Sequence, residues 1–457
     1  MADPASVSRV QIAIIPEVTR GTTPASPAFR ELPVHEGSFF QANRQFERSG
    51  IKRPNRQGGK QVGGSKDATG GLTLSLVNED SIKDLLESSL SGVLTQVTLT
   101  GFNGTFTSGS KIFSRLAGSF LTDPAANKIL LGDKVAILGS ASNKTTLNGG
   151  INASVTTIVL TSGAAFNTGT GAAKIENEWV TFTSMTSNTL NGVVRGAFGT
   201  VAAAHSTGVD AVPVREVTAI SATDLTFAND VVVTEASFAA TIHSNRYRAL
   251  AGTTRKFFSA AQRFTDLAFG EFFTGQEINT LTINVPTGGE VTMEANFVGL
   301  GFGTVEPGSS TYVATKGRTP MAGSIPGTAL LQDGASLPGV REVSIQIDNG
   351  RAALFQVGSD SGFGVSEGDF DATLALGIYL SDNVQAQKFQ AGTRFSLMTK
   401  AKDQDDGHEA WFEFPRCVFQ EAPKATDTNV VIQQATAYAE EDPTLQTKMV
   451  LHWRPNN

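Results

Sequence analysis

The chain has little cysteine, no long apolar run and no recognisable leader, and each absence excludes a class of protein. Cys417 is the single cysteine among 457 residues, so neither an internal disulfide framework nor a cysteine-based zinc site can form. No run of about 18 apolar residues occurs, which excludes a membrane-spanning helix. The first residues, Met1-Ala-Asp-Pro, carry neither a basic nor an apolar segment, so we expect no secretion signal and synthesis in a cytoplasm.

Charge is also scarce, and its sign is acidic. Charged residues make up 17% of the chain and the formal net charge is −7, whereas an average soluble protein has roughly 25% charged residues. A protein that grips nucleic acid usually presents a basic face, and an acidic surface repels phosphate. What the chain has instead is glycine, 47 residues of it, among short Thr, Ser and Val runs. This composition is typical of an all-β protein with many turns, and the length predicts two or three domains.

No catalytic or metal-binding constellation is recognisable. The Gly-rich stretch from Gly58 to Lys66 fails as a phosphate loop, because Gly64 stands where that motif needs lysine. The acidic run from Asp403 to His408 is too short for a calcium loop and lacks the distal glutamate, so a hairpin tip is the better interpretation. The five histidines have no metal-ligand spacing, and neither a nucleophile elbow nor a distinctive carboxylate pair is present. We therefore expect no enzyme activity, no cofactor and no metal.

One segment predicts a strand followed by the only helix. In Gly70-Gly-Leu-Thr-Leu-Ser-Leu-Val77 apolar and polar residues alternate, which indicates a strand with one face on a core. Asn78 suits the N-cap of the helix that follows, and Gly92 suits its end. The helix should pack against the sheet through one apolar stripe, formed by Ile82, Leu85, Leu86 and Leu90.

The strand patterns predict three parts, nested in one another. Residues 1–96 and 235–457 are expected to form one discontinuous β domain. Residues 97–143 and 214–234 are the two halves of a small β-barrel inserted into that domain. Residues 144–213 form a further β module within the barrel. Insertions succeed at exposed loop tips, so this module should project outward.

The strands of the large domain have a polar side without lysine or arginine. Ordinary solvent-facing sides mix both signs, whereas this one carries small polar groups and carboxylates. A sheet with one apolar and one neutral-to-acidic face is suited to line a water-filled passage, although an ordinary wet sheet face remains the alternative. The candidate channel-lining residues are Thr280, Thr282, Asn284, Glu290, Glu294, Glu342, Asp348 and Asp371.

Residues 43–66 are basic and have little periodicity. They are either a solvated hairpin or a basic arm that reaches an acidic surface on a neighbouring subunit. The candidate arm residues are Arg44, Arg48, Lys52, Arg53, Arg56 and Lys60.

An ordered set of segments resembles the major tail tube protein of long-tailed phages with non-contractile tails. Residues 118–123 are similar to the small barrel of such proteins. Residues 144–213 resemble a short β module of phage structural proteins, with the stretch 195–205 as its hallmark. The segments that carry the main resemblance are, in order, 71–77 with 84–92, 264–267 with 273–283, 289–299, 345–350 with 368–374, and 407–416.

The resemblance implies a tail-tube β-sandwich or barrel with one packed helix. It further implies a virion protein that assembles with itself as stacked hexameric rings around an acidic channel for genome delivery. DNA would pass without specific binding, the basic arm would contact the ring above or below, and a tape measure protein and tail-end proteins would be partners. No membrane is involved.

Two other functions remain open at this point. One is a capsid decoration protein or receptor-binding adhesin that acts through residues 144–213. The other is an enzyme on a β scaffold, such as a polysaccharide hydrolase, which would need a cleft with close carboxylates that the sequence does not offer.

Overall fold

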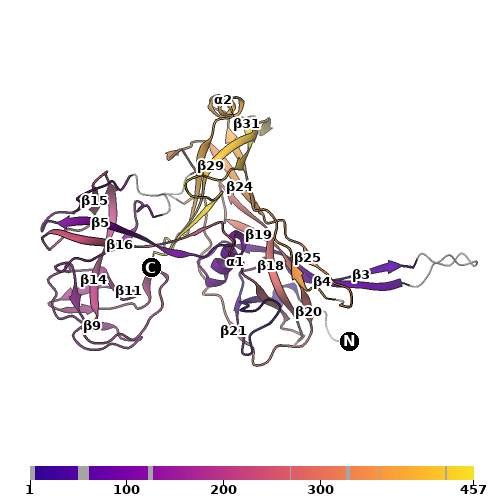
Figure 1. Ribbon diagram of the computed structural model, residues 1–457, viewed down its shortest axis with the longest axis horizontal. Coiled ribbons are helices and arrows are strands. Elements are labelled where there is room, and N and C mark those ends of the chain that lie inside the picture. Colours follow the sequence, from indigo (N-terminus) through magenta and orange to yellow (C-terminus); the bar gives the residue numbers. More distant parts are fainter. Residues whose placement is uncertain are drawn as a thin grey trace, which may run out of the picture. The chain divides into compact units, whose positions relative to one another are not determined.

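The computed structural model describes residues 6–49, 61–121, 127–267, 269–325, 330–359, 361–427 and 430–456. β-Strands dominate these residues, which also contain two α-helices, α1 (Asp80–Leu90) and α2 (Val384–Ala391) (Figure 1). The prediction of a mostly-β fold is confirmed. None of the described helices is long and apolar enough to cross a membrane.

The chain folds into two compact units. The first comprises Met1–Val93, Ala249–Asp405 and Trp411–Leu451, and the second comprises Leu94–Arg248, Asp406–Ala410 and His452–Asn457. Three strands contribute residues to both units: β16 (Glu235–Leu250), β29 (Glu409–Glu421) and β32 (Val450–Arg454).

Two sheets form the first unit. The smaller sheet is ordered β21–β2–β1–β17–β18–β20. Its strands are Thr311–Val313, Ala28–Glu31, Val10–Pro16, Phe258–Phe264, Phe269–Pro286 and Gly301–Gly303. The larger one, which we call the main sheet, is ordered β3–β4–β19–β18–β24–β27–β31–β29. Before β29, its further strands are β3 (Phe39–Arg48), β4 (Gln61–Ser75), β19 (Thr292–Gly299), β24 (Val340–Asp348), β27 (Asp371–Tyr379) and β31 (Val430–Ala439).

Shorter strands complete the first unit. β30 extends the main sheet beside β31, β22 pairs with β23 and β28, and β25 pairs with β26. Their bounds are Lys424–Asp427 for β30, Leu330–Gln332 for β22, Ala335–Ser336 for β23, Phe395–Lys402 for β28, Ala353–Leu354 for β25 and Gly364–Val365 for β26.

Strand β18 belongs to both sheets. Its first part pairs with β17 up to Gln276, and its second part pairs with β19 and β24 from Glu277 onward. The strand changes sheets near Gly275, whose φ of 64° is a backbone conformation that favours glycine. The Glu17 carboxylate accepts a hydrogen bond of 2.9 Å from the Gly275 amide, which holds the bend.

Helix α1 packs on β18 through the predicted stripe. Ile82, Leu85, Leu86 and Leu90 are all buried, as expected. The predicted N-cap is wrong by one residue, because Glu79 occupies that position and the helix begins at Asp80. A side chain at Gly92 would meet the Leu250 carbonyl oxygen at 2.1 Å, so the glycine is required by the close approach of two backbones.

Helix α2 was not predicted, since only one helix was expected. Its sequence, Val-Gln-Ala-Gln-Lys-Phe-Gln-Ala, has no apolar stripe, and Gln385 is its single buried residue. That glutamine exchanges two amide hydrogen bonds, of 3.0 and 3.1 Å, with Gln332 of β22. A polar contact between distant segments therefore holds this helix, and hydrophobic periodicity cannot reveal such a contact.

A buried ion cluster joins several parts of the first unit. The carboxylate of Glu277 is fully buried and accepts two hydrogen bonds from Arg255, at 2.7 and 2.5 Å. Arg351 lies 3.3 Å away and Arg20 lies 3.7 Å away. Arg351 also donates to the Ser91 hydroxyl at the end of α1. One carboxylate on β18 thus links the end of the helix to three arginines from separate segments.

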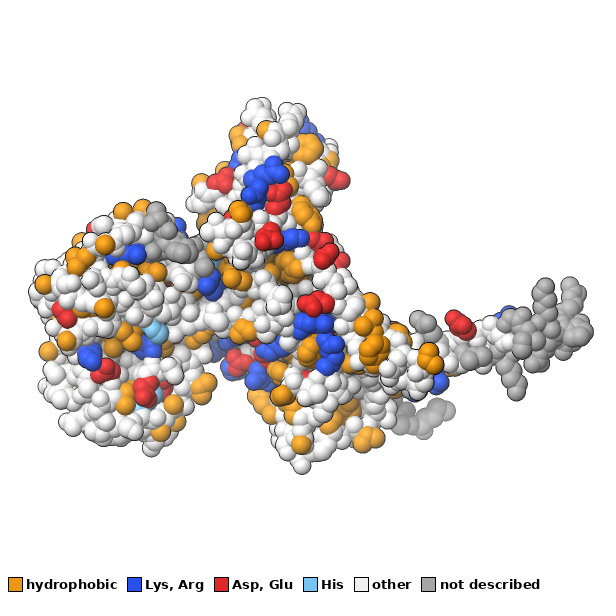
Figure 2. Space-filling model, in the orientation of Figure 1, with side chains coloured by type: hydrophobic (Ala, Val, Ile, Leu, Met, Phe, Trp, Pro, Cys, Tyr) orange, Lys and Arg blue, Asp and Glu red, His pale blue; other side chains and the backbone are white. Residues whose placement is uncertain are grey.

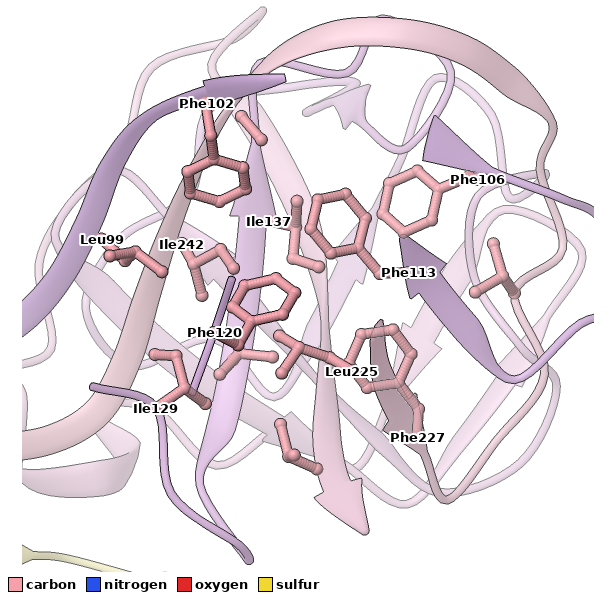
Figure 3. Packing of buried hydrophobic residues seen from close by; sticks show 14 of the residues in the cluster. Leu99, Phe102, Phe106, Phe113, Phe120, Ile129, Ile137, Leu225, Phe227 and Ile242 are labelled. Atoms are coloured by element: carbon pink, nitrogen blue, oxygen red, sulfur yellow. The ribbon is translucent and has the colours of Figure 1, made fainter. Parts of the chain in front are cut away.

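In the second unit, six strands pair in a closed cycle. The order β5–β6–β15–β14–β7–β16 returns to β5, so this part is a small barrel. Its core is rich in phenylalanine, including Phe102, Phe106, Phe113 and Phe120 (Figure 3). The strands other than β16 are Thr95–Phe106, Ile112–Arg115, Asp224–Phe227, Asp210–Ile220 and Lys134–Leu138, in that order.

The small barrel extends further along the chain than the sequence predicted, because it includes most of β16. The barrel was assigned residues up to 234, whereas the second unit continues to Arg248. The reason is that β16 pairs with β5 and β7 along residues 235–248 and closes the cycle. The pattern of a continuous strand cannot indicate where its pairing partners change.

Residues 144–213 have a hydrophobic core of their own. It includes Ile158, Ile175, Val180 and Leu190, and none of these belongs to the barrel core. The strands are β8 (Thr145–Thr146), β9 (Thr157–Val159), β10 (Gly171–Ile175), β11 (Glu178–Phe182), β12 (Ser184–Thr186) and β13 (Thr189–Asn191). We keep the interpretation that this segment is a nested module as a proposal.

Glu178 explains the hallmark stretch 195–205. Its carboxylate, 1% exposed, binds the Arg195 guanidinium at 2.7 and 2.8 Å and His205 Nε2 at 2.8 Å. It also accepts hydrogen bonds from the Gly196 and Ala203 amides. Burial by itself raises the pKa of Glu178, but these hydrogen bonds, led by Arg195, lower it to about 2. The hallmark is therefore a loop held around one carboxylate.

This pKa predicts acid sensitivity of the module. Because the folded pKa lies below the ordinary value of 4.5, the stabilisation is complete above pH 4.5 and is lost as pH falls towards 2. The shift corresponds to about 3 kcal/mol. Glu178→Gln should remove most of the pH-dependent stabilisation. The free energy of unfolding of this variant should therefore change less between pH 5 and pH 3 than that of the unmodified protein. Urea unfolding at both pH values, followed by hydrogen–deuterium exchange of peptides from residues 171–205, measures it. An equal pH dependence in both proteins would contradict the assignment.

Candidate functional site

The polar side of the main sheet is built from side chains in register across six strands. The central row contains Thr73, Glu294, Thr282, Gln346, Thr373 and Tyr438. A second row contains Asn296, Thr280, Asp348 and Asp371. A third contains Ser75, Thr292, Asn284, Ser344, Ala375 and Thr436. We call these three rows the polar face.

Hydrogen bonds between side chains run across this face. Asn296 donates to Thr280 at 3.0 Å, and Ser344 donates to Asn284 at 2.7 Å. Asn284 in turn donates to Glu294 at 3.4 Å. The opposite side of the same strands is buried, because strand residues alternate between the two faces. Period-two alternation thus creates the face, and cross-strand pairs order it.

The predicted channel-lining residues fall into two groups. Thr280, Thr282, Asn284, Glu294, Asp348 and Asp371 lie in the three rows. Glu342 lies beyond them, near the start of β24, opposite Pro286 and Gly377. Glu290 follows the turn between β18 and β19 and lies outside both strands. Seven of the eight residues are therefore on strands of one sheet.

The carboxylates differ in exposure and partners. Glu294, Glu342 and Asp348 are exposed, and none forms an ion pair with another residue of the described ranges. Glu290 is half-buried and lies 3.3 Å from His35 Nε2. The first three carboxylates are therefore the ones that supply uncompensated negative charge.

Asp371 is neutralised by residues that sequence reasoning missed. The Lys448 ammonium lies 2.6 Å from its carboxylate, and the Tyr438 hydroxyl donates to it at 2.5 Å. These two hydrogen bonds, Lys448 first, hold the pKa of Asp371 below its ordinary value. The alternation of β31 could have identified Tyr438. Lys448 lies outside the strands, so no periodic signal points to it.

The basic arm is described only in part. Arg44 and Arg48 lie on β3, which forms a two-stranded hairpin with β4 that extends from the rest of the sheet (Figure 1). The Arg44 guanidinium lies over the Phe46 ring at 5.3 Å, and Phe46 is itself exposed. The other predicted arm residues, Lys52, Arg53, Arg56 and Lys60, lie outside the described residues.

Among the described residues no metal cluster stands out, and the face drawn in Figure 2 carries no single-sign surface. No group of three or more His, Cys, Asp or Glu side chains within the described ranges could hold a metal ion. On the side of the first unit seen in Figure 2, acidic and basic side chains lie among each other. Cys417 is buried, and burial raises the pKa of its thiol to about 12, so it is a poor nucleophile.

Comparison with known families identifies a family for this chain. A family model described as phage tail tube protein matches residues 196–436, which is more than half of the chain. All eight candidate channel-lining residues lie inside the matched range, whereas Tyr438, Lys448 and the arm lie outside it. The comparison with curated proteins found no match.

Proposed function

The chain belongs to the phage tail tube protein family, and from this premise we propose that it forms stacked hexameric rings around an acidic channel for genome delivery. Membership itself makes the protein a structural component of the virion tail. The ring, the channel and the passage of DNA are the proposal. The single observation that carries it is the polar face, with neutral side chains in register and the exposed carboxylates of Glu294 and Asp348, which the exposed Glu342 of β24 extends beyond the three rows.

A wall that combines neutral polar side chains with a few carboxylates suits a polyanion that must move along it without binding. Non-specific affinity for DNA comes from lysine and arginine contacts to phosphate. The Lys448 ammonium contacts the polar face at Asp371, whose carboxylate neutralises its charge. Hydroxyl and amide groups keep the wall wetted, while the carboxylates repel phosphate over roughly a Debye length. This combination would let DNA slide through.

Exposed apolar side chains support self-assembly. Tyr379, Val384, Phe389, Val430 and Val431 are each at least 40% exposed, and they lie on β27, α2 and β31. A second set on β20 and around the β25–β26 pair contains Phe302, Leu354, Phe355 and Phe363. Exposed patches of this kind mark interaction surfaces, so both sets are candidates for contact between subunits. A tape measure protein and tail-end proteins are further proposed partners.

Electron microscopy of the concentrated protein tests the assembly directly. We expect hollow tubes with six-fold end views, in negative stain and at near-neutral pH. Tubes with another symmetry would overturn the hexamer while keeping the tube. Discrete trimers that bind host cells would overturn the tube and favour the adhesin that acts through residues 144–213.

The basic arm should act in stacking between rings. Arg44→Glu combined with Arg48→Glu is expected to raise the protein concentration needed for tube formation at least about tenfold, because like charges facing each other cost more than ~1.4 kcal/mol. Light scattering during assembly measures it. Lys111→Glu with Lys424→Glu, two exposed lysines outside the arm, is the control of equal charge change. Equal effects of the two pairs would contradict a specific role of the arm.

A further inference from the structure

In the second unit, a lysine of the barrel lies beside an asparagine from the last segment of the chain. The Lys134 ammonium donates a hydrogen bond of 2.8 Å to Asn456 Oδ1. Lys134 is the first residue of β7, whereas Asn456 follows β32, and 322 positions separate the two in sequence. A lysine amine is a nucleophile once it has lost its proton, and a carboxamide is an electrophile that can lose ammonia. The contact therefore brings two groups together that can react with each other.

Asn245 fixes the position of both segments. It lies on β16 and is 1% exposed. Its side-chain oxygen accepts a hydrogen bond of 2.9 Å from the backbone N–H of Lys134, and its side-chain nitrogen donates to the Pro455 carbonyl oxygen at 2.7 Å. One buried amide thus holds the backbone of the lysine and the backbone next to the asparagine at the same time.

Two further hydrogen bonds orient Asn456. Its backbone N–H donates to His408 Nδ1 at 3.0 Å, and its side-chain Nδ2 donates to the Asp406 carbonyl oxygen at 3.3 Å. The side-chain oxygen is left facing Lys134, and the carbonyl carbon lies one bond of about 1.23 Å beyond that oxygen. Holding a nucleophile and its target in place makes the reaction effectively unimolecular, which removes a large part of the barrier.

The surroundings of Lys134 favour the free amine. Burial lowers the pKa of Lys134 most and Arg454 lowers it further, whereas the Glu216 carboxylate acts in the opposite direction. The ammonium also lies 4.8 Å from the centre of the Phe198 ring, which covers it on one side. Loss of the proton exposes the lone pair that an attack on the amide needs.

Glu216 is placed to take up this proton. It is the register partner of Lys134 on the neighbouring strand β14, so the two side chains lie on the same face. Both residues also line one cavity, of about 280 Å³. Because Glu216 is exposed, its carboxylate can exchange protons with the solvent.

We propose that Lys134 and Asn456 form an isopeptide bond within the folded chain. The Lys134 ammonium gives one proton to Glu216, and the amine attacks the Asn456 side-chain carbon. A bond forms between Lys134 Nζ and Asn456 Cγ, and a second proton of Nζ passes to Nδ2. The bond between Cγ and Nδ2 breaks, and ammonia leaves and takes the proton from Glu216 as ammonium. The step needs no oxidant or co-reactant, closes a covalent loop in the chain, and does not depend on tube assembly.

Intact-mass spectrometry of the purified full chain, followed by trypsin digestion, tests the bond. We expect a chain lighter by one ammonia and a branched peptide that joins the segment of Lys134 to that of Asn456. Lys134→Arg keeps a cation beside Phe198, and it should abolish both signals, as should Asn456→Ala. Lys111→Arg, at an exposed lysine of the same unit, should leave both unchanged.

A time course that starts at synthesis of the protein tests the role of Glu216. Glu216→Gln should slow the formation of the branched peptide at least about tenfold, because a positioned base is lost. Glu36→Gln, at an exposed glutamate of the first unit, is the control and should form it at the normal rate. Equal rates in the two variants would overturn the role of Glu216.

The branched peptide distinguishes this bond from other losses of ammonia. An asparagine can also cyclise onto the next backbone N–H, but that product has no link to Lys134 and persists in Lys134→Arg. The proposal is overturned if the unmodified chain keeps its ammonia, if no branched peptide contains Lys134 and Asn456, or if Lys134→Arg loses ammonia to the same extent. The first two results come from the unmodified protein, so they stand even if a variant does not fold.

Discussion

Reversing three carboxylates of the candidate channel, with Glu294, Glu342 and Asp348 all changed to lysine, is expected to leave tubes intact and to slow genome ejection at least about tenfold. These three are chosen because they are exposed and have no cationic partner among the described residues. The change adds six positive charge units per subunit to the wall. Each new lysine can contact phosphate, so DNA would adhere at every ring. Ejection from phage particles that carry the variant, followed by dye fluorescence of released DNA, measures the rate.

Two controls, added salt and a matched variant, distinguish lysine–phosphate contacts in the channel from a general effect of the changed net charge on ejection. Contacts between lysine and phosphate weaken steeply with salt, so raising the salt should restore much of the ejection rate. Glu36, Asp369 and Glu441 are exposed carboxylates outside the polar face, and their change to lysine alters the net charge equally. The control should eject normally. If the variant with Glu294, Glu342 and Asp348 changed to lysine also ejects normally from intact tails, these three residues do not line the channel.

The sequence was sufficient to predict the polar face because alternation is a local property. Residues at every second position of the β18–β19 hairpin must share a side, so Thr280, Thr282, Asn284 and Glu294 could be grouped before any pairing was known. The same argument applied to β31 would have added Tyr438. Contacts that depend on distant loops gave no such signal. Lys448 reaches Asp371 from a segment without periodicity, and it changes the charge of the face.

The least predictable features are polar or non-local contacts. Helix α2 depends on the amide pair between Gln385 and Gln332 rather than on an apolar stripe. The closed barrel depends on β16, whose pattern is uniform although its residues enter two units. The burial of the Glu277 carboxylate among arginines could not be predicted either, since charged residues in a sequence are ordinarily expected at the surface. In all three cases the deciding information is which distant segment lies alongside.

Changing Glu277 to glutamine is expected to lower the free energy of unfolding of the first unit by about 3–5 kcal/mol, because removing one partner of a buried ion pair leaves the other charge uncompensated. Here the loss would affect Arg255, Arg351 and, more weakly, Arg20. Glutamine keeps the volume, so packing should change little. Urea unfolding followed by hydrogen–deuterium exchange of peptides from β18 measures the effect in the correct unit.

Glu440 offers a control with similar chemistry and different burial. Its carboxylate accepts hydrogen bonds from two arginines, at 3.2 Å from Arg394 and 2.8 Å from Arg416, but its side chain is 27% exposed. Water screens such a pair, so Glu440→Gln should cost less than about 1 kcal/mol. Equal effects of the two substitutions would show that burial does not determine the contribution of Glu277. A large effect at Glu277 alone would identify its carboxylate as the point where α1, β18 and the three arginines are held together, and hence as a requirement for any subunit that presents the polar face.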